Sequence, residues 1–208
     1  MFKHCGDNAM AITKRTIKRL LAGACLACAC SAGVLAATEV NGVKFNDSVQ
    51  VAGKDLLLNG AGMRTKFIIK VYAAGLYLPE KKNTVADIVK LEGPRRVSLV
   101  MMRDISSSDF SEAFMTGLDN NIDRTEKAKF APQIGKFNDL FRQISGLKKG
   151  DALVLDWIPG SGTQCELNGK KIGEVVPDVN FYHALLRIWL GDKPVDSTLK
   201  PQLLGETK

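Results

Sequence analysis

The stretch that decides the fold runs from Asn59 to Pro79 and reads NGAGMRTKFIIKVYAAGLYLP. Gly60 and Gly62 allow positive φ and close backbone approach, and the residues after Arg64 are rich in β-branched and aromatic side chains, which favour strands. We therefore predict a glycine-rich turn that leads into one long central strand. Pro79 ends this strand because proline has no backbone N–H to donate.

The predicted strand has two different faces. Because side chains alternate along a strand, Arg64 and Tyr72 lie on the same face, which begins polar and ends apolar, while the other face is nearly all apolar. An arginine and a tyrosine can together hold an anion. Eight residues of straight strand span about 26 Å, so the two side chains meet only if the chain bends or folds back between them. Lys70, on the same face, is expected to lie in solvent.

The rest of the chain alternates between groups of strands and groups of helices. Strand patterns occur at 39–51, where Asn41-Gly42 indicates a hairpin turn, and at 95–105, 152–158, 163–167 and 171–175. Helical spacing occurs at 84–91, 106–122, 130–147, 178–191 and 197–204. The order predicts an α+β domain, with a large, mostly antiparallel sheet covered on one face by helices.

Local signals predict where several of these helices begin. Thr84, Asp178 and Ser197 are the expected N-caps, since their side-chain oxygens can accept from free N–H groups of the first turn. The charged segment 123–129 is expected to be a break between two amphipathic helices.

The N-terminal 36 residues have the layout of a secretory signal peptide. Four basic residues between 14 and 19 precede an apolar, small-residue run that ends in Ala36-Ala37. We predict removal of 1–36 by cleavage after Ala36 or Ala37, with Met10 as an alternative start to Met1, which leaves 37–208 as a single periplasmic or secreted domain. The alternative is an N-terminal membrane anchor, but the run is shorter than the roughly 20 strongly apolar residues that span a bilayer. No stable membrane span is expected after removal.

The net charge does not indicate nucleic-acid binding. The chain has a formal charge of +7, but 5 of its 29 basic residues precede residue 37 and the others are scattered along the sequence. Because nucleic-acid binding leaves a basic patch as its footprint, we expect no nucleic-acid partner.

Few residues remain for metal, redox or thiol chemistry. Four of the five cysteines lie in the first 30 residues, which leaves Cys165 and His183 in the expected mature chain. A single thiol forms no internal disulfide, and Cys165 in an alternating strand is expected to be a packed apolar side chain. Nothing in the local sequence supports a catalytic Cys165–His183 pair. With no Cys/His cluster and no phosphate-binding lysine loop, we expect neither a metal nor a cofactor.

Two segments together resemble the chalcone isomerase-like proteins, specifically their exported bacterial branch. They are the stretch at 59–79 and NGKKIGEVVPDVNFYHALLRIWLGDKPVD at 168–196. The resemblance covers essentially all of the expected mature chain. It implies an open-faced sandwich, in which a large antiparallel sheet lies against a layer of helices with a ligand cleft between them.

The resemblance implies one of two functional types. Plant enzymes of this family cyclise a flavonoid precursor, using an arginine in the glycine-rich motif and a threonine in the K-[FV]-x-A-x-G-[LV]-Y motif. In this sequence the arginine position is Arg64, but the threonine position holds Tyr72. A further threonine position falls at about Ile188, which cannot donate a hydrogen bond, and these departures argue against isomerase chemistry. Non-enzymatic relatives bind fatty acids and hold the carboxylate with an arginine and a tyrosine at the two corresponding positions, which Arg64 and Tyr72 match.

Three hypotheses follow for the function. The first is an exported, non-catalytic protein that binds a fatty acid or a similar amphipathic carboxylate through Arg64 and Tyr72. The second is an intramolecular lyase or related isomerase acting on an unsaturated carbonyl, with Arg64 and Tyr72 as its catalytic residues. The third is a structural or partner-binding envelope protein whose Arg64 site is vestigial and whose interior is filled by side chains. For the two residues themselves, the alternative to a ligand site is that Arg64 pairs with an acid and Tyr72 is ordinary core.

Overall fold

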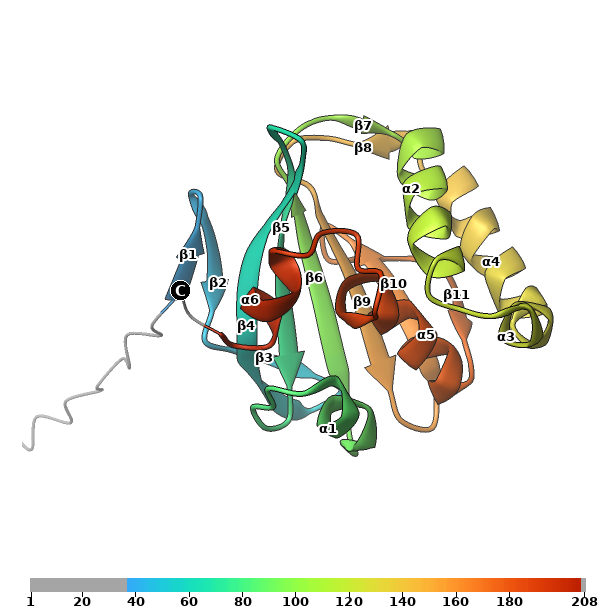
Figure 1. The fold of residues 1–208 in the computed structure, drawn as a ribbon, viewed down its shortest axis with the longest axis horizontal. Helices are drawn as coiled ribbons and strands as arrows, with labels where there is room; N and C mark the ends of the chain where they lie inside the picture. The colour runs from blue at the N-terminus through green and yellow to red at the C-terminus, as the bar shows by residue number, and fades with distance from the viewer. Residues whose placement is uncertain (1–36, 207–208) are drawn as a thin grey trace, which may run out of the picture. The chain divides into compact units, whose positions relative to one another are not determined.

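A seven-stranded antiparallel sheet forms the centre of residues 37–206, the part of the chain that the computed structural model describes (Figure 1). Its strand order is β11-β10-β9-β6-β5-β4-β3, and every neighbouring pair is antiparallel. The strands are β3 (Ser48–Val51), β4 (Lys54–Lys66), β5 (Ile69–Leu78), β6 (Arg95–Met101), β9 (Ala152–Ile158), β10 (Gly162–Leu167) and β11 (Lys170–Val176). Two small pairs complete the strands: β1 (Ala37–Val40) with β2 (Val43–Asn46), and β7 (Ile105–Ser106) with β8 (Gly146–Leu147). The predicted signal peptide lies outside the described residues.

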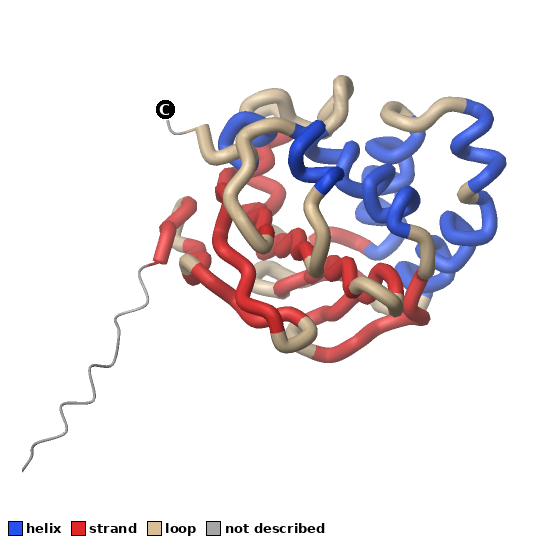
Figure 2. The backbone as a smooth tube through the Cα atoms, turned by 90° about the horizontal axis from the view of Figure 1, so that it is seen from below, coloured by secondary structure: helices blue, strands red, loops and turns tan. Residues whose placement is uncertain are grey.

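The helices gather on one face of the sheet, as Figure 2 shows. They are α1 (Val85–Lys90), α2 (Ser107–Asp119), α3 (Arg124–Lys129), α4 (Ala131–Arg142), α5 (Val179–Leu190) and α6 (Leu199–Leu203). The β1–β2 hairpin packs on the opposite face, where Phe45 lies against Gly75 of β5. This arrangement confirms the predicted α+β class, with a large antiparallel sheet and a helical layer.

Aromatic side chains hold α2, α4 and α5 together. The Phe114 ring of α2 lies 5.7 Å from the Phe137 ring and 5.2 Å from the Phe141 ring, both on α4, and 6.2 Å from the Trp189 ring of α5. Such pairs add to the free energy gained by burying the rings. They fix the position of α2, which forms one wall of the cleft described below.

The prediction of one long strand after Arg64 is wrong. The glycine-rich segment belongs to β4, which continues to Lys66; Phe67 and Ile68 then turn the chain, and β5 runs back beside β4. The sequence carries no turn signal here, because two-residue hairpin turns favour glycine, asparagine or aspartate. Phe67 nevertheless adopts a φ of 57°, a region in which a bulky residue is an outlier.

The helix starts agree with the sequence at two of three positions. The side chains of Thr84 and Asp178 cap α1 and α5 as predicted. The expected break at 123–129 is wrong: it forms α3, which begins with a capping box between Asp123 and Glu126. The prediction for Ser197 is also wrong, because the carboxylate of Asp196 accepts the free N–H groups before α6.

The glycines of β4 let α6 pack directly on the strand. A Cβ added at Gly60 would lie 2.8 Å from the carbonyl oxygen of Leu203, and one at Gly62 would lie 2.8 Å from Leu199 Cδ1. Next to them, the Asn59 side chain donates to the Leu203 carbonyl oxygen at 2.8 Å. Close helix approach therefore explains these glycines, rather than the predicted turn.

We expect Gly60→Ala to lower the free energy of unfolding by about 1–3 kcal/mol, because the added methyl group pushes α6 off the sheet. Gly135→Ala is the matched control: its Cβ meets nothing within 4 Å inside α4, so it should stabilise the protein by about 0.5–1 kcal/mol. Chemical denaturation followed by circular dichroism measures both. Equal effects of the two substitutions would contradict the packing argument.

Asp196 attaches the connection between α5 and α6 to the sheet. Its carboxylate accepts the backbone N–H of Thr65 on β4 at 2.8 Å, that of Thr198 at 2.8 Å and that of Leu199 at 3.2 Å. Burial acts to raise the pKa of Asp196, but these hydrogen bonds outweigh it and hold the pKa below its usual value. The carboxylate therefore stabilises the fold only in its ionised form.

We expect Asp196→Asn to destabilise the protein by about 1 kcal/mol at neutral pH, because an amide offers one acceptor oxygen in place of two. A pKa that is lower in the folded state gives stabilisation that is complete above the unfolded pKa and is lost as the pH falls through the folded value. The gap in Tm between wild type and variant should therefore be constant above about pH 5 and close below about pH 4. The exposed Asp139→Asn is the control, and a gap independent of pH would contradict this assignment.

Candidate functional site

Arg64 and Tyr72 lie side by side, as the sequence-predicted pair requires. The turn at Phe67 and Ile68 folds the chain back, and Arg64 of β4 becomes the direct cross-strand partner of Tyr72 on β5. The guanidinium carbon lies 5.3 Å from the centroid of the tyrosine ring, within the range of a cation–π contact.

The Arg64 guanidinium has no partner within residues 37–206. It makes no ion pair and no hydrogen bond there, and its Nε is buried. Arg96 shows the contrast, since it donates two hydrogen bonds to Asp156 at 2.7 and 2.6 Å. The expectation that Arg64 pairs with an acid finds no support in this part of the chain, so its donors remain available to a ligand.

The Tyr72 hydroxyl is fixed by a neighbour from α5. Trp189 Nε1 donates to the Tyr72 oxygen at 2.8 Å, and only 4% of Tyr72 is exposed. Burial raises the pKa of Tyr72, although the nearby Arg64 opposes the shift. The phenol therefore stays protonated, and with its oxygen already accepting from Trp189 it has its own proton to donate.

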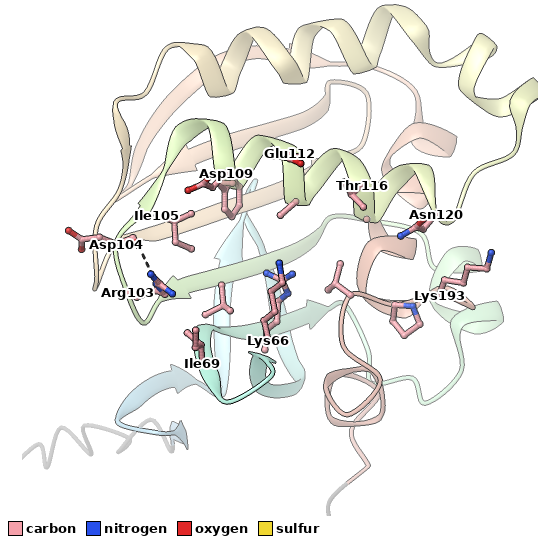
Figure 3. A pocket seen from close by; sticks show the side chains of 17 residues that line it. Lys66, Ile69, Arg103, Asp104, Ile105, Asp109, Glu112, Thr116, Asn120 and Lys193 are labelled. Atoms are coloured by element: carbon pink, nitrogen blue, oxygen red, sulfur yellow. Dashed lines mark hydrogen bonds between the residues drawn. The ribbon is translucent and has the colours of Figure 1, made fainter.

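A cleft of about 690 Å³ opens beside Arg64 (Figure 3). Its walls are the β4–β5 hairpin, α2 and the segment 193–195 that follows α5. Its apolar lining comprises Ile69, Val71, Ile105, Phe110, Ala113, Pro194 and Val195. Its charged lining comprises Arg64, Lys66, Arg103 and Lys193, with Asp104, Asp109 and Glu112. In Figure 3 the Lys66 side chain points from the hairpin toward α2, which carries Asp109 and Glu112.

A second, smaller cavity adjoins Arg64 toward the core. It measures about 20 Å³ and lies among Tyr72, Leu99, Phe114, Ile188 and Trp189, with further lining from α2 and Val195. This volume suffices for about one water molecule. Ile188 thus lines this cavity beside Arg64 with an apolar side chain.

Cys165 and His183 do not form a catalytic pair in the described chain. Burial raises the pKa of the Cys165 thiol to about 12, and no hydrogen bond joins it to His183. His183 Nε2 instead lies 3.0 Å from an Arg95 nitrogen, and burial together with Arg95 and Arg187 lowers its pKa to about 4. Among residues 37–206, no three His, Cys, Asp or Glu side chains are arranged to hold a metal ion.

Several residues of the site were not singled out from the sequence. Trp189 carries a helical core pattern, but nothing in that pattern marks its N–H as the partner of Tyr72. Lys66, Arg103 and Lys193 come from three separate segments, so only the tertiary structure brings them to one cleft. Arg64 follows the same pattern, since its neighbour Thr65 is bound by Asp196. That the Arg64 Nε is buried and has no partner within residues 37–206 becomes visible only in three dimensions.

Comparisons with known proteins agree with this architecture. Residues 37–205 match the family described as chalcone isomerase-like. Among solved structures, the crystal structure of a fatty-acid binding protein from Arabidopsis thaliana is similar, with a TM-score of 0.64 and 17% sequence identity over 78% of this chain and 92% of that chain. No curated protein matches the sequence. No helix in residues 37–206 is long and apolar enough to cross a membrane. On its match over nearly the whole described region, the chain belongs to the chalcone isomerase-like family.

Proposed function

We propose that the protein is exported and that its cleft binds a fatty acid or a similar amphipathic carboxylate without converting it. One observation carries this proposal. The Arg64 guanidinium, unpaired in the described chain, lies beside a cleft with an apolar lining. A partly buried positive charge without a counter-ion is unfavourable, and a bound carboxylate would supply the missing charge and acceptors.

The two side chains suit a carboxylate head group. Arginine presents a planar fork of donors that can bond both carboxylate oxygens, and the Tyr72 hydroxyl can add a third hydrogen bond. The Trp189 hydrogen bond keeps the Tyr72 oxygen in place while its proton is free to turn toward the ligand. Such preorganisation reduces the entropy lost on binding.

The cleft suits an apolar tail. Its volume of about 690 Å³ lies within the range of small-molecule sites. The inner cavity of about 20 Å³ is too small for an acyl chain. We therefore infer that the tail lies along α2, against Ile105, Phe110 and Val195, rather than between the aromatic rings of the core.

Two further points support binding over catalysis. The structurally similar Arabidopsis thaliana protein is a fatty-acid binding protein. In addition, Ile188 and Tyr72 stand where the catalytic relatives that this sequence resembles carry threonines.

The presence of a large cleft next to Arg64 also favours a ligand over the third hypothesis, which expects an interior filled by side chains.

We expect Arg64→Ala to weaken the binding of a long-chain fatty acid by about 10- to 100-fold, because hydrogen bonds to a charged group are lost. Tyr72→Phe should weaken it by about fivefold, since it removes one neutral donor. Arg142→Ala is the matched control, because Arg142 is exposed and pairs only with Asp139 on its own helix. Isothermal titration of delipidated protein measures all three, and unchanged affinity of Arg64→Ala for every acid tested would refute the proposal.

We expect no cyclisation of a hydroxylated chalcone above the rate in protein-free buffer, because the threonine donors of the catalytic relatives are missing. Loss of the chalcone absorbance with time measures the reaction. Turnover that disappears in Arg64→Ala would instead favour the isomerase hypothesis, with Arg64 stabilising a developing oxyanion.

A further inference from the structure

The tip of the β4–β5 hairpin exposes large apolar side chains. Phe67 is 91% exposed, Ile68 is 94% exposed and the following Ile69 is 45% exposed. The other large apolar side chains exposed in residues 37–206, Leu57 and Val175, lie singly on strands. The tip is therefore an apolar cluster on the surface of the described domain.

Folding does not explain these residues. Phe67 and Ile68 form the two-residue turn between the paired residues Lys66 and Ile69, and Phe67 has a φ of 57°. Glycine or asparagine would adopt this conformation with less strain. An aromatic side chain that is both strained and exposed contributes little to the stability of the fold, and such exposure indicates a partner outside the chain.

Lysines flank the apolar tip, while the acidic side chains of Asp104, Asp109 and Glu112 lie on its cleft side. Lys66 and Lys70 flank it, and no acidic residue lies between them. Lys70 Nζ bonds the neutral Asn41 side chain at 2.6 Å, so its charge is not offset. Arg103 lies at the same end of the sheet, because the preceding residue, Met102, donates its N–H to the Val71 carbonyl oxygen near the start of β5.

We propose that the β4–β5 tip docks on an anionic lipid bilayer. Phe67 and Ile68 would enter the boundary between head groups and acyl chains, while Lys66 and Lys70 contact lipid phosphates. A second copy of this chain is a poorer occupant. Three side chains at a hairpin tip bury far less than the area of roughly 1,000 Å² that a stable interface needs, and the flanking lysines of two copies would repel each other.

Docking in this way places the cleft at the lipid surface. Lys66 and Ile69 belong to the tip and also line the cleft beside Arg64 (Figure 3). An amphipathic molecule could then pass between bilayer and cleft without crossing water. This consequence rests on the proposed function, whereas the docking itself does not.

The test is flotation of the purified, host-processed protein with vesicles of phosphatidylglycerol or of phosphatidylcholine. We expect the wild type to float with phosphatidylglycerol, and to be released as the ionic strength rises from about 0.01 M to about 1 M, which shortens the Debye length about tenfold. The double variant Phe67→Gly with Ile68→Ser removes both apolar side chains and places glycine at the turn position with positive φ, so its Tm should be equal or higher. Its partition coefficient should fall at least tenfold. Lys66→Ser should lower the coefficient about fivefold.

Val175→Ser is the control, because it removes an exposed apolar side chain from β11, at the other end of the strand order, and should leave flotation unchanged. Equal flotation of wild type and double variant would overturn the proposal. Binding to both lipids that does not depend on salt would also overturn it. The same holds for a wild-type dimer, detected by sedimentation, that the double variant does not form. Fatty-acid affinity of the double variant, measured without vesicles, should match the wild type, so a failure of docking and a failure of ligand binding can be distinguished.

Discussion

The cross-strand contact between Arg64 and Tyr72 is the interaction on which the site depends. It exists only because Phe67 and Ile68 reverse the chain, and it holds a guanidinium with a buried, unpartnered Nε against an aromatic ring. Asp196 secures the adjacent residue, Thr65, and so fixes both the strand and the segment that closes the cleft. A charge kept without a partner costs stability, and proteins accept such a cost most often where a ligand binds.

The core and the cleft divide the space between sheet and helices. Aromatic rings of α2, α4 and α5 fill one part, where a cavity of about 20 Å³ lies behind Arg64. The other part, between α2 and the β4–β5 hairpin, stays open at about 690 Å³. Arg64 and Tyr72 therefore lie at the boundary between the packed core and the accessible cleft. A head group bound there would leave its tail in the open part.

The sequence predicts the fold class and the two central residues, but not the way they meet. Alternation identifies strands, and it cannot show that one apolar run is two strands, because Phe67 and Ile68 lack the usual chemistry of a turn. The glycines of β4 likewise indicate a turn, because the helix that requires them, α6, lies about 140 residues later in the sequence. The sequence also contains the capping-box residues of α3, Asp123 and Glu126, which indicate the start of a helix. The high charge of 123–129 instead favours a solvated break, and the prediction follows the charge.

The same limit applies to the site. Strand alternation puts Arg64 and Tyr72 on one face, and the resemblance to the chalcone isomerase-like family assigns both to a ligand site. The hydrogen bond from Trp189, the carboxylate of Asp196 and the basic residues of the cleft depend on contacts between distant segments, for which one sequence gives no signal. Close packing and orphaned polar atoms become visible only in three dimensions.

The measurement that tests the central claim most directly is native mass spectrometry of the protein purified from the compartment to which its own cells deliver it. Export predicts a chain that begins at Ala37 or Thr38. Binding of a carboxylate at Arg64 predicts an added mass, which denaturing extraction releases as a fatty acid or related amphiphile. A bare chain that takes up no added fatty acid would contradict the account.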